Sequence, residues 1–80
     1  MGAAMEHQNE LYRGWQLDVA IDGDETAGYY IARQTMRFAV TGGPRNVPIP
    51  AARFADKDVA FSDAFERLRH AVEEFEGKPA

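Results

Sequence analysis

The segment 54-FADKDVAFSDAFERLRHAVEEFEG-77 has the pattern of one amphipathic helix with a start signal and a stop signal. Asp56 is a suitable N-cap, and Gly77 is typical of a helix end. We therefore expect a helix from about Lys57 to Glu76. Apolar residues recur at spacings of three and four and form one broad stripe, which predicts a helix that lies on a sheet. They are Ala60, Phe61, Ala64, Phe65, Leu68, Ala71, Val72 and Phe75.

Two segments before this helix have the pattern of strands. From Tyr12 to Ile21, apolar side chains alternate with polar or small ones, which predicts a strand with one buried face. The residues from Asp22 to Gly28 favour turns and predict a hairpin loop. The segment 29–40 is rich in aromatic and β-branched residues and predicts a second strand.

The phase of this second strand is ambiguous. Tyr29 and Ile31 fall on one face. The other face would carry Tyr30, Met36, Phe38 and Val40. A bulge or turn near Arg33 to Thr35 would reconcile the two halves. Two short strands, or one long strand whose second face is open to a partner, are the alternatives.

A break and an extended segment follow. Residues 41–46 contain two glycines and a proline, and Val47–Pro50 suits an edge strand or a covering loop because its prolines donate no backbone hydrogen bond. The β-β-β-α order predicts an α+β domain with an antiparallel sheet of about three strands and one C-terminal amphipathic helix. We expect residues 11–77 to form this single domain, between a disordered N-terminal tail (1–10) and a short C-terminal tail (78–80).

The composition narrows the class of protein. Of the 80 residues, 45% are hydrophobic and 28% are charged, as in a folded globular domain. The absence of cysteine rules out a disulfide framework and suits a reducing cytoplasm, where we expect this protein. We find no signal peptide and no long apolar run, so we expect no membrane association. The net charge of −4 argues against a main role in neutralising nucleic-acid phosphates, although a local basic patch would be compatible with it.

No set of residues has the spacing of a catalytic or metal site. His7 and His70 have no further ligands close in sequence, so we expect neither a metal nor another cofactor. Ser62 lacks the Gly-x-Ser-x-Gly turn of hydrolases. The acidic loop that contains Asp22 and Glu25 lacks the spacing of a calcium-binding loop, and we interpret it as a solvated hairpin tip. We expect no enzymatic activity, and the alternative is a small enzyme that uses these two carboxylates.

Arginine and aromatic residues gather in the middle of the chain. The candidate interaction residues are Tyr30, Arg33, Met36, Arg37 and Arg45. Protein interfaces are enriched in these residue types, so we expect a surface that binds a protein partner or a second copy of the chain. Arginine beside aromatic rings on a sheet also holds single-stranded nucleic acid by charge and stacking, which is the alternative function.

Three motifs carry a resemblance to known proteins. They are Tyr12-Arg13-Gly14-Trp15, Gly28-Tyr29-Tyr30-Ile31-Ala32-Arg33 and Phe54-Ala55-Asp56-Lys57-Asp58-Val59-Ala60-Phe61. This pattern resembles small uncharacterised bacterial proteins built as β-strands followed by one helix. The Gly-Tyr strand and the helix entered through a short acidic turn are also similar to HicB-like antitoxin domains. That resemblance implies a partial RNase H-like fold and a regulatory role, in which the domain binds and blocks a small RNA-cleaving toxin.

Overall fold

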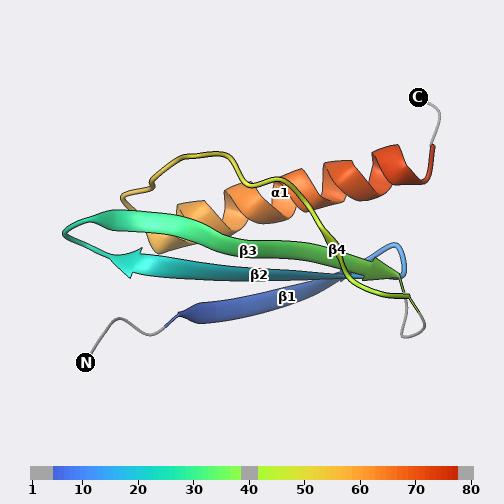
Figure 1. The fold of residues 1–80 in the computed structure, drawn as a ribbon, viewed down its shortest axis with the longest axis horizontal. Coiled ribbons are helices and arrows are strands. Elements are labelled where there is room, and N and C mark those ends of the chain that lie inside the picture. Colours follow the sequence, from blue (N-terminus) through green and yellow to red (C-terminus); the bar gives the residue numbers. More distant parts are fainter. Residues whose placement is uncertain (1–4, 39–41, 78–80) are drawn as a thin grey trace.

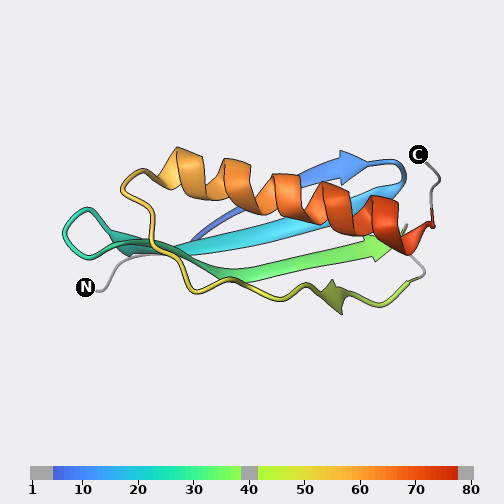
Figure 2. The ribbon, with the colours of Figure 1, turned by 90° about the horizontal axis from the view of Figure 1, so that it is seen from above.

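A computed structural model describes residues 5–38 and 42–77, in which four strands precede one helix (Figure 1). The elements are β1 (Glu6–Tyr12), β2 (Trp15–Asp24), β3 (Gly28–Phe38), β4 (Arg45–Asn46) and α1 (Lys57–Phe75). The strands form one antiparallel sheet in sequence order, and α1 lies along one side of it (Figure 2). The predicted α+β class with one C-terminal helix is therefore confirmed, and the fourth strand is only two residues long.

The hydrophobic core lies between α1 and the sheet. Alternate residues of β2 face the helix, and Leu17, Leu68 and Val72 are among those fully removed from solvent. The core cluster consists of Trp15, Leu17, Val19, Ile21, Ile31, Met36, Ala60, Phe61, Ala64, Phe65, Leu68 and Val72. Burial of each large side chain contributes roughly 1.5–3 kcal/mol, so this contact between helix and sheet is the main stabilising interaction of the domain.

The start of α1 agrees with its sequence signal. The side chain of Asp56 accepts a hydrogen bond from the backbone amide of Asp58 at 2.9 Å, as expected for an N-cap. Glu76 is the C-cap, and Gly77 follows with a φ of 63°, a left-handed conformation that glycine adopts without strain. The helix therefore ends one residue before the predicted Glu76.

β3 contains a bulge at Ala32. Ile21 pairs with Ile31 whereas Ala20 pairs with Arg33, so Ala32 is an extra residue without a partner on β2. The extra residue reverses the alternation of side chains, and even-numbered residues after it face α1 as odd-numbered residues do before it. Of the alternatives that the sequence left open, the structure has the bulge, one residue before its predicted position.

β1 occupies part of the segment predicted to be a disordered tail. Residues 6–12 pair with β2, from Glu6 opposite Ile21 to Tyr12 opposite Trp15. The prediction of a tail is therefore wrong for residues 6–10, while its residues 1–4 and the predicted C-terminal tail at 78–80 lie outside the described residues. The strand was missed because both faces of β1 are mainly polar, so its hydropathy does not alternate.

A two-residue turn joins β1 to β2. Arg13 has a φ of 53° and Gly14 a φ of 82°. Two positive φ angles in succession are those of a type I′ turn, whose twist matches that of the flanking strands. The strand predicted from Tyr12 to Ile21 is therefore divided by this turn, and β2 runs on to Asp24.

Polar side chains attach β1 to α1. Each contact joins a helix-facing side chain of the strand to a side chain on the helix. The pairs are Glu6 with Lys57 at 2.7 Å, Glu10 with Arg69 at 2.7 and 3.0 Å, and Tyr12 with Glu73 at 2.6 Å. These contacts explain why a strand with few apolar residues is held against the domain.

Of the two alternatives for Val47–Pro50, an edge strand or a covering loop, the structure has the loop, and Val47 packs against the core. The amide of Val47 donates to the carbonyl of Gln34 at 3.1 Å, but Val47–Pro50 continues as an irregular segment. Further along, Tyr29 and Phe54 exchange two backbone hydrogen bonds of 2.8 Å. The chain is thereby tied along β3 before it enters α1.

Candidate interaction surface

Three of the five predicted interaction residues share one face of the sheet. Tyr30, Arg33 and Arg37 lie on the face opposite α1, as their register with β2 requires. Figures 1 and 2 show α1 on the other side of the sheet. We call the side away from α1 the open face.

The remaining two predicted residues lie elsewhere. Met36 is 5% exposed and belongs to the core, so its assignment to an interaction surface is wrong. The bulge at Ala32 is the physical reason, because it turns Met36 towards α1. Arg45 is exposed on β4, and its guanidinium lies 4.2 Å from the ring centroid of Phe75 on the helix side.

The open face carries charges of both signs around a shallow depression. The depression has a volume of about 290 Å³. It is lined by His7, Asp18, Val19, Arg33, Thr35, Arg37 and Pro44. Arg37 donates a hydrogen bond of 3.0 Å to Gln16, and the Tyr30 hydroxyl donates one of 3.4 Å to Asp22. Because Asp18 and Asp22 alternate with the arginines, the open face is not a dense cationic surface.

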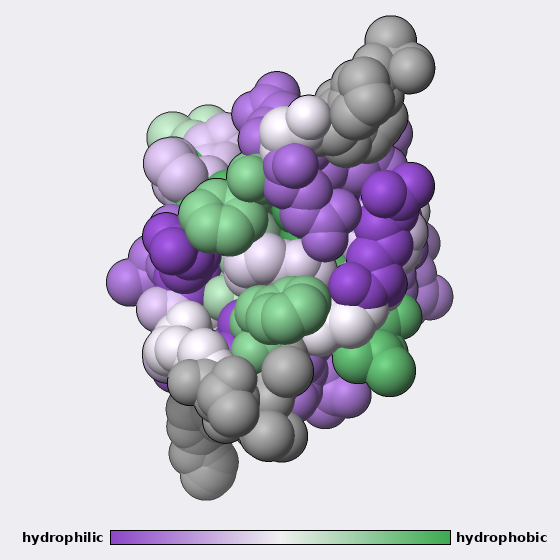
Figure 3. Space-filling model, turned by 90° about the vertical axis from the view of Figure 1, so that its right-hand side faces the viewer, coloured by the Kyte–Doolittle hydropathy of each residue, from purple (hydrophilic) through white to green (hydrophobic). Residues whose placement is uncertain are grey.

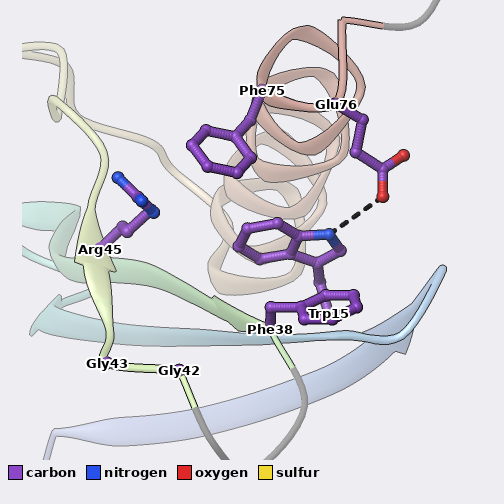
Figure 4. A pocket seen from close by; sticks show the side chains of 7 residues that line it. All are labelled: Trp15, Phe38, Gly42, Gly43, Arg45, Phe75 and Glu76. Carbon is purple, nitrogen blue, oxygen red and sulfur yellow. Dashed lines mark hydrogen bonds between the residues drawn. The ribbon is translucent and has the colours of Figure 1, made fainter.

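An apolar pocket of about 350 Å³ lies where α1 ends (Figure 4). Trp15 packs against Phe38 and Phe75, each at a centroid distance of 5.2 Å. The indole N–H of Trp15 donates to Glu76 at 3.1 Å. Figure 3, which looks onto this end of the molecule, shows hydrophobic side chains surrounded by hydrophilic ones. Trp15 is buried, whereas Phe38 and Phe75 are half exposed at its rim, and we interpret the pocket as the end of the core.

The outer edge of β1 is a surface that the sequence did not reveal. β1 is a terminal strand of the sheet, paired only with β2 among the described residues. It is seven residues long, and its central residues His7, Gln8 and Asn9 are exposed. Leu11, on the open face, is 77% exposed. The Arg13-Gly14 turn is a signal for a strand before it, but residue types do not show that this strand lies at the edge of the sheet.

The two edges of the sheet differ in how well they are protected against pairing with a further strand. Proteins usually shield an edge strand with charged side chains, above all Lys, with Pro, with a bulge or by keeping the strand very short. β4 has two residues and lies between Pro44 and Pro48. β1 contains neither Lys nor Pro, its two glutamates are paired with Lys57 and Arg69 of α1, and its register with β2 is regular. The β1 edge is therefore open to a further strand.

The histidine, serine and carboxylate side chains discussed above do not form one site in the part of the chain that the structure describes. Among the described residues, no three His, Asp or Glu side chains lie close enough together to hold a metal ion. Asp22 accepts hydrogen bonds from the Gly23 amide and from Tyr30, and Glu25 lies in an exposed turn. His70 and Ser62 are exposed on α1. Within the described residues, no helix combines the length and the apolar character needed to span a membrane.

Comparisons with protein-family models, with curated proteins and with solved structures give no match to this chain. The geometry of the sheet therefore carries the functional argument.

Proposed function

We propose that this chain is a cytoplasmic, non-catalytic protein-interaction module with a regulatory role, and that it binds its partner by adding a strand to β1. The observation that carries the proposal is the unprotected seven-residue edge of β1. Such an edge presents backbone donors and acceptors in a row, and strand addition satisfies them with main-chain hydrogen bonds. The HicB-like resemblance supports the same class of function, since those domains act by binding a protein.

Asn9→Pro tests this proposal. Tyr12 and Trp15 flank the type I′ turn and form a hydrogen-bonded pair, and such pairs alternate along an antiparallel ladder. The amide of Asn9 is therefore directed at the free edge, and proline removes this donor while it keeps the bonds to β2. We expect Asn9→Pro to stay folded by circular dichroism and to lose at least tenfold in affinity for the partner or second copy that the parent chain binds.

Asn9→Ala is the matched control, because it changes the side chain and keeps the backbone donor. We expect it to bind like the parent chain in light scattering and in co-purification from the source cells. If the parent chain binds neither itself nor another protein, or if Asn9→Pro binds as well as Asn9→Ala, the proposal is wrong.

Nucleic-acid binding is the second candidate, since Tyr30, Arg33 and Arg37 share the open face. It predicts affinity for single strands that falls steeply with salt and with Arg33→Ala and Arg37→Ala, and that is insensitive to Asn9→Pro. The interleaved carboxylates and the net charge of −4 favour the protein partner over this candidate.

A further inference from the structure

We propose that the strand added to β1 is β1 of a second copy of this chain, antiparallel and centred on Asn9. This inference rests on the proposed function and names the partner of the same edge. It follows from three properties of the strand: the direction of its peptide groups, the positions of its glutamates and the course of α1 above it.

The direction of the peptide groups limits where the second copy can bind. Tyr12 pairs through hydrogen bonds with Trp15, so alternation directs the peptide groups of Leu11, Asn9 and His7 away from β2. All three residues are exposed. They provide three amides and three carbonyls at the free edge.

A two-fold axis perpendicular to the sheet keeps both helices on the same side and places residues of the same face opposite each other. With Asn9 on the axis, Asn9 faces its own copy, and His7 faces Leu11 of the second copy. Each of these pairs can exchange two hydrogen bonds, which gives six across the seven-residue strand. An axis at Gln8 or Glu10 leaves only two such pairs within β1.

Charge selects the same register. An axis at Gln8 places Glu6 opposite Glu10 of the second copy, twice, and an axis at Glu10 places this residue opposite itself. Like charges directly opposite each other destabilise a pair of strands. An axis at Asn9 avoids both contacts, since it places Glu10 opposite Gln8 and Glu6 opposite Tyr12. It also covers part of Leu11, the most exposed large hydrophobic residue described.

The course of α1 leaves room for the second copy. The helix packs mainly on β2 and β3 and reaches β1 through long side chains along its length, from Lys57 with Glu6 near its start to Glu73 with Tyr12 near its end. In the antiparallel arrangement, the helix start of one copy lies beside the Tyr12 end of the other. At that end the helix of the other copy also reaches β1 through a long side chain, Glu73, and the outward-directed residues His7, Asn9 and Leu11 stay exposed.

Single cysteines test the register directly, because the chain has no cysteine of its own. In the proposed dimer the two copies of residue 9 have Cα atoms about 5.5 Å apart, within disulfide range. We expect oxidised Asn9→Cys to run as a covalent dimer on a non-reducing gel. Leu11→Cys is the control on the same face, and its two copies are separated by about 13 Å along the strand. It should stay monomeric on the gel.

The solution mass completes the test. We expect light scattering of the parent chain across a concentration series to show a twofold increase to the dimer mass, and Asn9→Pro to remain at the monomer mass. A parent chain that is monomeric at every concentration would overturn the dimer. If a different protein then co-purifies in an Asn9→Pro-sensitive manner, the proposed function stands without the dimer, and if none does, both fall. Cross-linking of Leu11→Cys but not of Asn9→Cys would overturn the register.

Discussion

Gln34 is a buried polar residue whose side chain connects three parts of the fold. It is 1% exposed, and its amide nitrogen donates to the carbonyls of Val47 and Pro48 at 3.3 and 2.7 Å. Its carbonyl oxygen accepts from Arg67 of α1 at 3.2 Å. One side chain therefore joins β3, the segment after β4 and the helix.

We expect Gln34→Leu to lower the free energy of unfolding by about 1–3 kcal/mol, because it leaves the Arg67 guanidinium and the Pro48 carbonyl without this partner. Urea denaturation measures the change. Gln16→Leu is the control, since Gln16 makes one part-exposed contact with Arg37, and it should cost less. Equal stability of Gln34→Leu and the parent chain would contradict the importance of this network.

At the residue scale, the sequence predicted the role of residues that depend on near neighbours. It did not predict the burial of residues that follow the bulge in β3. Asp56 was identified as the N-cap because the signal is local. Met36 and Gln34 were not recognised as core residues, because the bulge at Ala32 exchanges the faces of β3 and the sequence offered it only as one of several alternatives.

At the scale of elements, β1 depends on polar contacts with α1. A hydrogen bond from Lys57 lowers the pKa of Glu6 below its ordinary value of 4.5, and Glu6 raises the pKa of Lys57 above 10.5. Likewise, the hydrogen bond to Glu73 raises the pKa of the Tyr12 hydroxyl. Glu6 and Lys57 are therefore both charged at neutral pH, and their ion pair stabilises the folded state there.

These pKa directions predict how acid affects the strand. A carboxyl whose pKa is lowered on folding contributes stability above its ordinary pKa, and the contribution is lost as the pH falls through the lowered value. We expect Glu6→Gln to be less stable than the parent chain at about pH 7. The difference should shrink as the pH falls below 4.5, as measured by urea denaturation at several pH values. Glu25→Gln, in the exposed turn after β2, controls for the loss of one negative charge without this partner. A pH-independent difference would contradict the role of the ion pair.

The sequence predicted the elements with clear periodicity and missed β1. The helix has a continuous apolar stripe, and β2 has one buried face, so both were found to within a few residues. β1 is held by side chains that are 51–61 positions away along the chain, from Glu6 with Lys57 to Tyr12 with Glu73. A pattern within one segment cannot show contacts of this kind.

At the scale of the whole molecule, dimer formation through β1 would couple stability to concentration. Because a partner that binds only the folded state stabilises it by mass action, we expect the thermal midpoint of the parent chain to rise by roughly 5 °C for a hundredfold increase in protein concentration. Calorimetry or circular dichroism measures the shift. Asn9→Pro should melt at one temperature throughout, and a concentration-independent midpoint for the parent chain would contradict self-association.

The α+β architecture itself was predictable because the sheet is a meander whose strands pair in sequence order. The hairpin between β2 and β3 is signalled locally by the turn residues from Asp22 to Gly28, and the apolar stripe of the helix indicates that it lies on a sheet. The open face was partly predictable, through Tyr30, Arg33 and Arg37. The β1 edge was not, since an edge is defined by the absence of a neighbour and leaves no mark on residue types.

The unequal edges of the sheet also determine how large an assembly can become. Pairing through a two-fold axis consumes the β1 edge of both copies and leaves β4 at each end of the joined sheet. Those ends present two residues beside Pro44 and Pro48, too little for a further chain to extend the ladder. In the proposed dimer, growth would therefore stop at two copies, and the protein would avoid the fibrils that a long free edge at each end invites.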